Sequence, residues 1–350
     1  MRRLCRLLAA VIFGGLPSAA TSAPEPGDHT FELRAGGVER SYILHQPANR
    51  RPRPAVVLNF HGGGGNARQY QAYVQTDRLA EREGFLVVYP NGSGVLRERL
   101  LTWNAGGCCG YAMRANVDDV GFVRALLEDL AARVVFDRTR VYATGLSNGA
   151  MMSYRLAAEL PEAIAAIAPV AGAMVLGSTP PAHAKPVLHI HSVDDHRALY
   201  AGGLGAPFPF TAVRVLHPGV EARLALWAQA NGCDDALQSV AERDWTDSAG
   251  RRHVATLLRY AHCRVETALW RLRGAGHVWP SAQLDYLPAL LGPGTRVIDA
   301  NEEIWRFFQR HRLGAPSAAD ASALETRQAR SDAASLSCAQ SSDIDGGQGC

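Results

Sequence analysis

Lysine is almost absent from this sequence of 350 residues, because Lys185 is the single lysine among 36 basic side chains and the others are arginine. Chemistry that depends on an amine, such as Schiff-base formation, therefore has only one candidate residue. Lys185 lies between alanine and proline and does not match the G-x-x-x-x-G-K-[ST] phosphate-binding loop. Schiff-base catalysis and P-loop nucleotide binding are both disfavoured.

A large excess of charge is also missing. The 36 basic and 33 acidic residues leave a net charge of +3, which gives no signature of binding to nucleic acid. Hydrophobic residues make up 47% and charged residues 20%, so the chain can bury a core and is not disordered throughout. One large α/β domain is expected, and we expect it to be a monomer.

No apolar run reaches the ~20 residues that a membrane helix needs. The N-terminus instead has three early arginines, an apolar stretch over residues 7–16 and small residues over 18–23, which is typical of a secretory signal peptide. Cleavage after Ala20 or after Ala23 would fit, and no cysteine follows for a lipid anchor. The sequence predicts a signal peptide over residues 1–23 and a secreted protein, extracellular or periplasmic, without a membrane anchor.

Removal of the signal takes away Cys5 and leaves six cysteines in a protein expected to meet an oxidising compartment. Neighbouring Cys108 and Cys109 are not expected to bridge each other, and a disulfide between Cys233 and Cys263 is favoured. No C-x-x-C spacing supports a zinc ribbon, and no metal or cofactor is expected. The remaining cysteines are Cys338 and Cys350.

The last part of the chain has few large apolar residues. Residues 314–350 are rich in Ala, Ser, Asp, Gln and Gly, a composition that cannot offset the entropy of ordering. We predict a flexible low-complexity tail there and a single catalytic domain over residues 24–313.

Short apolar runs alternate with helical patterns through that domain. Two strands are expected around the Gly36-Gly37 turn, at residues 29–35 and 38–45. Near-continuous apolarity in later runs indicates strands that are buried on both faces, as in a mostly parallel sheet flanked by helices. These strands are predicted at 55–60, 85–89, 140–144, 163–168, 187–191 and 267–272. Helices are predicted at 117–136, 148–160, 222–231 and 301–311, the last capped by Asn301.

One predicted strand runs directly into Gly145-Leu-Ser147-Asn-Gly149, a G-x-S-x-G pattern followed by a helix. In that context the glycines allow a tight turn that exposes a serine hydroxyl above the sheet. Ser147 is the candidate nucleophile. The alternative is a serine in an ordinary glycine turn.

A serine needs a histidine as base and a carboxylate that orients the histidine. In hydrolases of this sheet type the acid and the histidine follow later strands in that order. Asp194 and Asp195 follow the strand at 187–191, and His277 follows the strand at 267–272 in a glycine loop. His277 could instead be a structural surface histidine.

Two further motifs bear on the chemistry. The glycine-rich segment His61 to Asn66 could supply backbone donors for an oxyanion, and Gly63 N–H with Asn148 N–H is the expected pair. His189 and His191 alternate along a strand, a spacing open to a metal site, but buried histidines bonded to backbone are the simpler interpretation.

The chain resembles the polyhydroxybutyrate depolymerase and feruloyl esterase group of secreted α/β-hydrolases over residues 30–312. The resemblance rests on several segments in the same order. They are His61-Gly-Gly-Gly-Gly-Asn-Ala, Trp103-Asn-Ala-Gly with Cys108-Cys109-Gly110, Val117-Asp-Asp-Val-Gly-Phe122, Gly145-Leu-Ser-Asn-Gly-Ala-Met-Met152, Ala168-Pro-Val-Ala-Gly172, Asn231-Gly-Cys233, Gly276-His-Val-Trp-Pro280 and Ile304-Trp-Arg-Phe-Phe308.

The resemblance implies an α/β-hydrolase fold and assigns the acid to Asp195, because His191-Ser-Val-Asp-Asp195-His196 matches a family loop. Serine stands there in place of the usual glycine and His196 in place of proline. The resemblance also implies that Trp279 forms a wall of the substrate pocket with Trp103 nearby, although both could be core residues.

The sequence therefore predicts a serine esterase with the triad Ser147, Asp195 and His277, acting without a cofactor on small or oligomeric esters. The tail adds no polymer-binding domain, which argues for soluble or amorphous substrates. A serine peptidase or acyltransferase on the same fold, or a non-catalytic secreted binding module, are the alternatives.

Overall fold

The computed structural model describes residues 24–207, 213–234, 236–282 and 286–314. The predicted signal peptide and nearly all of the predicted tail lie outside the described residues, as do Cys5, Cys338 and Cys350.

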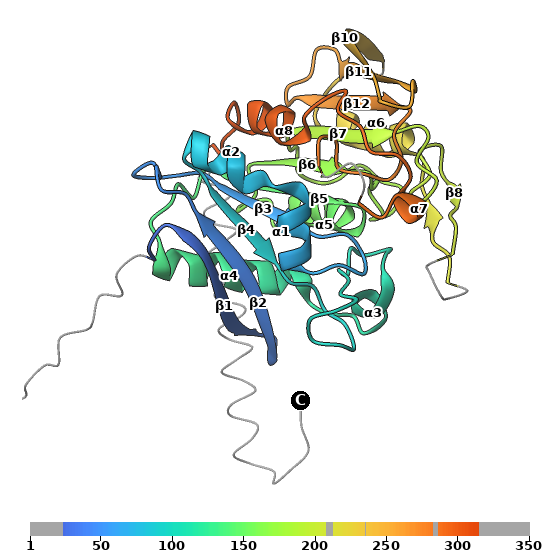
Figure 1. Ribbon diagram of the computed structural model, residues 1–350. Helices are drawn as coiled ribbons and strands as arrows, with labels where there is room; N and C mark the ends of the chain where they lie inside the picture. The colour runs from blue at the N-terminus through green and yellow to red at the C-terminus, as the bar shows by residue number, and fades with distance from the viewer. Residues whose placement is uncertain (1–23, 208–212, 235, 283–285, 315–350) are drawn as a thin grey trace, which may run out of the picture.

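A ten-stranded sheet forms the centre of the molecule, in the order β1-β2-β4-β3-β5-β6-β7-β12-β11-β10 (Figure 1). The six strands from β4 to β12 in that order run parallel, and antiparallel strands extend the sheet at both ends. The strands are β1 Gly27–Ala35, β2 Val38–Gln46, β3 Val56–Phe60, β4 Leu86–Pro90, β5 Val141–Leu146, β6 Ala166–Val170, β7 Val187–Ser192, β10 Leu237–Thr246, β11 Arg252–Tyr260 and β12 Thr267–Arg273. A separate hairpin pairs β8 Gly203–Leu204 with β9 Leu216–His217.

Helices cover both faces of the sheet (Figure 1). Their bounds are α1 Ala67–Val74, α2 Thr76–Glu83, α3 Gly110–Arg114, α4 Asp119–Arg133, α5 Asn148–Glu159, α6 Val220–Ala230, α7 Pro288–Leu291 and α8 Ala300–Phe308. Alternate strand residues point to opposite faces, so Leu58 packs in one core with α4, α5 and α6, whereas Val57 packs in a second core with α1, α2 and α8. The mostly parallel sheet flanked by helices, which the buried apolar runs predicted, is confirmed.

The structure differs from the sequence prediction in several elements, and helices α1, α2, α3 and α7 were not predicted. The long strands β10 and β11 were not predicted, and a register shift between Ser239 and Ala241 interrupts their pairing. The cap of α8 is Asp299, whose carboxylate accepts from Glu302 N at 3.1 Å, and not Asn301. The Asn301 side chain instead joins α8 to Thr76 Oγ1, at 2.9 Å, and to the Val74 carbonyl, at 2.8 Å.

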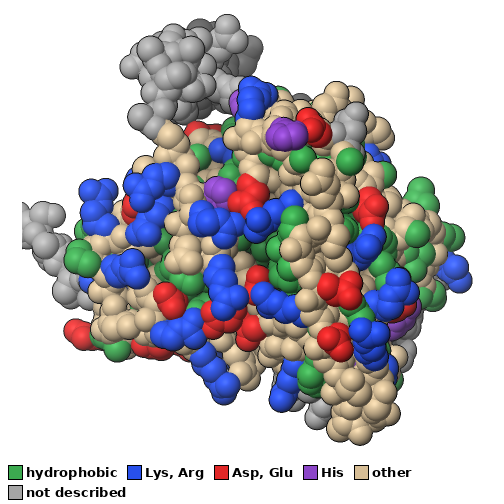
Figure 2. All heavy atoms as spheres, turned by 90° about the horizontal axis from the view of Figure 1, so that it is seen from above, with side chains coloured by type: hydrophobic (Ala, Val, Ile, Leu, Met, Phe, Trp, Pro, Cys, Tyr) green, Lys and Arg blue, Asp and Glu red, His purple; other side chains and the backbone are tan. Residues whose placement is uncertain are grey.

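Charged side chains of both signs are interspersed over the face seen in Figure 2. Exposed ion pairs of the described residues include Arg124 with Glu162 at 2.8 Å and Arg138 with Glu128 at 2.9 Å. These exposed pairs contribute little to stability individually.

Candidate active site

The serine turn lies at the carboxyl end of β5. Ser147 follows the strand directly, has φ 60° and ψ −118°, and precedes the first residue of α5. This φ is costly for a residue with a side chain, and such strain is held at functional sites by surrounding contacts. Ser147 N donates to Val170 O at 2.8 Å, and Met151 N donates to Ser147 O at 3.0 Å. The turn therefore presents a half-buried serine at the start of a helix.

Close backbone packing explains the glycines of the G-x-S-x-G pattern. A side-chain carbon at Gly145 would lie 2.5 Å from the Phe60 carbonyl oxygen, and one at Gly149 would overlap the same atom. Helix α5 can therefore sit against β3 only because both positions are glycine.

The glycine-rich loop after β3 reaches the serine. A side-chain carbon at Gly62 would lie 3.5 Å from Ser147 Cβ. Gly64 N donates to Leu101 O at 2.8 Å and Gly65 N donates to Gly62 O at 3.1 Å. Gly63 N–H has no hydrogen-bond acceptor within the described residues, which leaves it available to a ligand. Asn148 N–H is in the first turn of α5, where amides lack helical partners.

His61 holds this loop in shape. Its Nε2 accepts from Gly92 N at 3.0 Å and its Nδ1 lies 2.8 Å from Gly62 O, an arrangement that requires the neutral ring with the proton on Nδ1. Burial lowers the pKa of His61 to about 4, which agrees with a neutral imidazole.

The two neighbouring aspartates after β7 have different roles. Asp195 is 3% exposed, and its Oδ1 accepts from Arg197 N and Ala198 N, both at 2.8 Å. Asp194 accepts from Gly274 N at 2.6 Å and so ties the acid loop to the end of β12. Asp195 is therefore buried inside the acid loop, whereas Asp194 links that loop to the sheet, and Asp195 as the acid stays a prediction.

His277 and Asp195 meet directly. His277 Nδ1 lies 2.7 Å from Asp195 Oδ2, and the histidine is 5% exposed. His277 N donates to Leu291 O at 2.6 Å, and a side-chain carbon at Gly276 would overlap that same oxygen, so the glycine before the histidine allows the contact. The carboxylate thus fixes the imidazole with Nδ1 as donor, so that Nε2 is the ring nitrogen that carries the lone pair.

Sheet topology explains why residues so far apart in sequence share one edge. Strands β5, β7 and β12 all run parallel, with β6 between the first two. Ser147, Asp195 and His277 each follow the carboxyl end of one of these strands, where functional loops of open α/β sheets lie.

Burial and hydrogen bonding act in opposite directions on Asp195. Burial alone would raise the pKa of this carboxyl group, but the charge and hydrogen bonds of His277 and His191 more than offset it. The pKa of Asp195 is therefore held well below its usual value, and the carboxylate stays ionised. Burial and the nearby His277 also lower the pKa of His217, on β9, to about 4.

Trp103 lies beneath the serine turn as a core residue. It is 0% exposed, its indole N–H donates to His61 O at 3.0 Å, and its ring packs edge-on against Phe60 at 5.1 Å. Its backbone N–H and carbonyl both bond the Asn148 side chain, at 2.7 and 3.0 Å. Among the two interpretations offered for Trp103, full burial favours the core.

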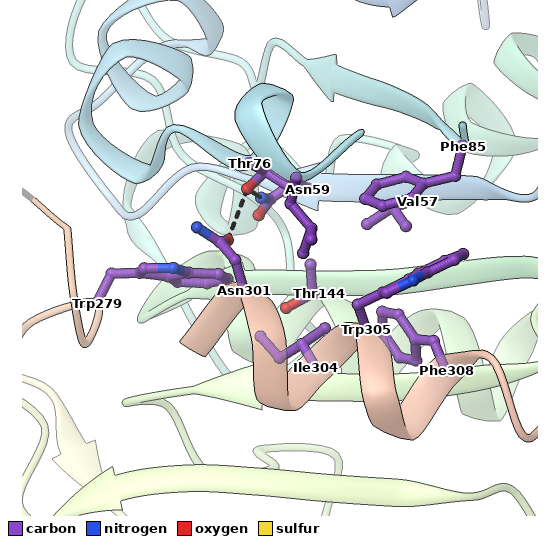
Figure 3. Close-up of a pocket in the computed structure, with 11 residues that line it drawn as sticks. Val57, Asn59, Thr76, Phe85, Thr144, Trp279, Asn301, Ile304, Trp305 and Phe308 are labelled. Carbon is purple, nitrogen blue, oxygen red and sulfur yellow. Dashed lines mark hydrogen bonds between the residues drawn. The ribbon is translucent and has the colours of Figure 1, made fainter. Parts of the chain in front are cut away.

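Trp279 is also buried, at 2% exposed, and borders a small cavity between β3, α2 and α8 (Figure 3). The cavity measures about 10 Å³, enough for about one water molecule and far too small for an ester. Polar atoms of its lining residues that have no hydrogen-bond partner within the described residues include Trp279 Nε1 and Asn59 Oδ1. The structure therefore places Trp279 in the core as well.

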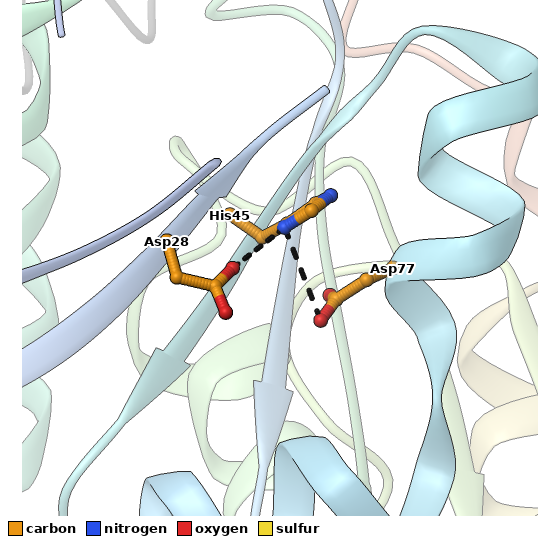
Figure 4. A group of neighbouring side chains, drawn as sticks. All are labelled: Asp28, His45 and Asp77. Carbon is orange, nitrogen blue, oxygen red and sulfur yellow. Dashed lines mark hydrogen bonds and ion pairs between the residues drawn. The ribbon is translucent and has the colours of Figure 1, made fainter. Parts of the chain in front are cut away.

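One group of side chains could offer ligands to a metal ion. Asp28, His45 and Asp77 place oxygen and nitrogen atoms within 4.8 Å of one another (Figure 4). His45 Nδ1 lies 2.7 Å from Asp28 Oδ1 and 3.9 Å from Asp77 Oδ2. A histidine that is hydrogen-bonded to Asp28 and has the Asp77 carboxylate nearby explains this cluster, which lies at the opposite edge of the sheet from Ser147.

The disulfide between Cys233 and Cys263 is confirmed, and it joins the end of α6 to the turn between β11 and β12. The prediction for the adjacent cysteines was wrong, because Cys108 and Cys109 are also joined. The peptide bond between them is cis, which brings their Cα atoms to 3.1 Å, closer than the 3.8 Å of a trans pair.

The sequence did not predict that His189 and His191 form a hydrogen-bonded chain next to Asp195. His191 Nε2 lies 2.8 Å from Ala198 O, as expected for a buried histidine bonded to backbone, but it also lies 3.2 Å from Asp195 Oδ2. The spacing of two between His189 and His191, immediately before the acid, was the available signal, because it puts both rings on one face of the strand.

A serine turn, a glycine loop and a carboxylate–histidine pair on one edge of this sheet define an α/β-hydrolase. The family model described as esterase PHB depolymerase matches residues 40–254, and the chain belongs to this family. Among the described residues, no helix combines the length and apolar character needed to cross a bilayer.

Curated relatives include feruloyl esterase B of Piromyces equi, 30% identical over 189 residues, which covers 51% of this chain and 32% of that protein. NocK of Nocardia uniformis subsp. tsuyamanensis, named as an esterase, is 28% identical over 76% of this chain and 78% of its own length. The chain thus spans about a third of that feruloyl esterase. A solved acetyl xylan esterase from Aspergillus awamori shares the fold, with a TM-score of 0.53 and 16% identity, over 80% of this chain and 99% of its own.

Proposed function

We propose that the protein is a secreted serine hydrolase of carboxylic esters that uses Ser147, His277 and Asp195 as its triad. The observation that carries the proposal is the 2.7 Å contact of His277 Nδ1 with Asp195 Oδ2. This contact lies at the sheet edge where Ser147 directly precedes α5. The names of the relatives, feruloyl and acetylxylan esterases, support an ester as substrate. Export is supported by the N-terminal sequence pattern.

In the proposed reaction, Ser147 Oγ attacks the ester carbonyl while His277 Nε2 takes its proton. Gly63 N–H and Asn148 N–H stabilise the oxyanion, a contribution of about 3 kcal/mol of barrier for each donor. His277 then protonates the leaving alcohol, and water releases the acyl group by the same steps in reverse. Asp195 stays ionised throughout and stabilises the imidazolium.

Replacement of the nucleophile tests the proposal. Ser147→Ala is expected to lower kcat on p-nitrophenyl butyrate by about 10⁴-fold or more, because no other group can form the acyl-enzyme. Ser239→Ala, an exposed serine on β10, is the control and is expected to keep full activity. Equal ester turnover by Ser147→Ala and the wild type would exclude the triad. If both turn over ester only at the uncatalysed rate, a non-catalytic binding module is favoured.

A substrate panel defines the class of ester. Methyl ferulate, acetylated xylan, hydroxybutyrate oligomers and a peptide amide would be compared on the full chain. Ester turnover is expected to exceed amide turnover, and comparable rates on several esters would identify a generalist. Faster turnover of the amide would instead identify a peptidase.

A further inference from the structure

Asp195 contacts two histidines, and the proposed triad uses only one. Oδ2 of the carboxylate lies 2.7 Å from His277 Nδ1 and 3.2 Å from His191 Nε2. We propose that His191 is a positioning residue that holds Asp195 for His277, and that His189 and Tyr154 fix the hydrogen-bonding state of His191. This inference rests on the proposed function, because it concerns the same acid.

The contacts of His191 determine where its proton lies. Its Nε2 faces the Ala198 carbonyl at 2.8 Å and the Asp195 carboxylate, and both neighbours can only accept. Nε2 must therefore carry the hydrogen. Since His191 is 2% exposed, water does not compete for this donor, and the hydrogen bond to the Ala198 carbonyl keeps Nε2 within 3.2 Å of the carboxylate, as a second polar neighbour besides His277.

A buried chain of hydrogen bonds continues behind His191. His191 Nδ1 lies 3.1 Å from His189 Nε2, and His189 Nδ1 lies 2.9 Å from the Tyr154 hydroxyl. Burial and the neighbouring His191 hold the pKa of His189 well below its usual value, and burial raises that of Tyr154, so both are neutral. The Tyr154 O–H then donates to His189, which donates to His191, whose Nε2 lies beside Asp195.

This chain joins the two halves of the proposed site. Tyr154 lies on α5, the helix that starts directly after Ser147, while His189 and His191 lie on β7 and lead into the acid loop. The hydrogen-bond chain thereby couples the orientation of the Asp195 carboxylate to α5, the helix that follows Ser147. Other ionisable groups around Asp195 are His277 after β12, His217 on β9 and Arg197 in the acid loop itself.

The test compares His191→Leu, which removes the donor, with His191→Gln, which keeps an N–H. For the leucine variant we expect kcat on p-nitrophenyl butyrate to fall on the order of tenfold with KM unchanged, as for other residues that orient a catalytic ligand. The acid limb of its kcat/KM profile should move to higher pH, because a carboxylate with one polar neighbour fewer binds the imidazolium more strongly. The glutamine variant should restore most of kcat and most of the wild-type pH profile. Tyr154→Phe should lower kcat less than His191→Leu and shift the acid limb in the same direction.

His45→Gln is the matched control, since His45 is a buried histidine paired with a carboxylate at the opposite edge of the sheet. It is expected to change the melting temperature without changing the pH profile. If His191→Leu gives a wild-type profile and kcat, or if the loss is the same for the glutamine variant, the positioning role is wrong.

A readout that needs no turnover separates this inference from the proposed function. The far-downfield proton resonance of the His277–Asp195 hydrogen bond would be recorded for the full chain by NMR. If the wild type cleaves no ester but shows this resonance, and His191→Leu loses it, His191 positions the acid although the proposed function fails. If the wild type cleaves esters and His191→Leu keeps the resonance and the activity, the positioning role alone is overturned.

Discussion

At the scale of single residues, Asn148 contributes to the site with both its backbone and its side chain. The backbone N–H is at the start of α5 and is a proposed oxyanion donor. The side chain clamps the backbone of Trp103 by two hydrogen bonds, at 2.7 and 3.0 Å. The buried Trp103 in turn packs against His61 of the glycine loop, with ring centroids 5.0 Å apart. One residue thus connects the serine helix to the loop that carries the second donor.

We expect Asn148→Ala to lower the free energy of unfolding by about 2 kcal/mol, because it leaves the buried backbone N–H of Trp103 without a partner, whereas the Trp103 carbonyl keeps the hydrogen bond from Cys109 N at 3.0 Å. Urea denaturation would measure the change. The isosteric Asn148→Asp keeps the shape but places an acceptor against the Trp103 carbonyl, so it should be no more stable than the alanine variant. Wild-type stability in either variant would contradict the clamp.

The residues of the proposed triad were within reach of sequence reasoning because each follows a strand in a known order. The choice between Asp194 and Asp195 required the family loop, since one position of loop geometry separates them. The burial of Trp103 and Trp279 could not be read from the sequence, because a tryptophan beside a glycine loop fits a pocket wall and a core equally well. The cis bond between Cys108 and Cys109 has no local signal either.

At the scale of elements, the end of α8 is tied to the start of β12 through Glu266. Its carboxylate accepts from Arg310 Nη2 at 2.9 Å and lies 3.2 Å from His311 Nε2. Burial raises the pKa of Glu266, but the hydrogen bonds from His311 and Arg310 more than offset this and lower it to about 2. The ionised form of Glu266 is therefore favoured in the folded protein.

A carboxyl group whose pKa is lowered by folding stabilises above its unfolded pKa, and the contribution is lost as the pH falls through the folded value. For Glu266 that window runs from about 4.5 down to about 2. We expect Glu266→Gln to lower the melting temperature at pH 7, with a difference from wild type that shrinks across this window. Calorimetry at several pH values measures it. The control Glu32→Gln, at an exposed position on β1, should show no such trend, and a constant difference at every pH would contradict the role of Glu266.

Elements were predictable where burial is complete. Strands such as β3, β5 and β7 are buried throughout because both faces are covered, and the apolar residues that dominate their sequences made them predictable. Strands β10 and β11 were missed because most of β10 is exposed and its residues are mixed in polarity. Tertiary position, and not local pattern, makes these segments strands.

At the scale of the whole molecule, the disulfide between Cys233 and Cys263 encloses β10 and β11. The two cysteines are 30 residues apart, so the bond restricts a long loop of the unfolded chain. By the loop-entropy relation, the double variant Cys233→Ser/Cys263→Ser should lose about 3.6 kcal/mol of unfolding free energy.

Chemical denaturation of the oxidised protein would measure that loss. Wild-type protein treated with a reductant is the control and should move towards the stability of the double variant. An unchanged denaturation midpoint in the variant would show that β10 and β11 are held by their sheet contacts alone.

The position of β10 as the last strand of the sheet also bears on the behaviour of the protein at high concentration. A free sheet edge exposes unpaired backbone groups, and another copy of the chain can add to it. The irregular pairing at Ser239 and Ala241 and the exposed charges of Glu242, Arg243 and Asp244 counter such edge-to-edge aggregation. The same strand that extends the sheet therefore also protects the molecule from polymerising through it.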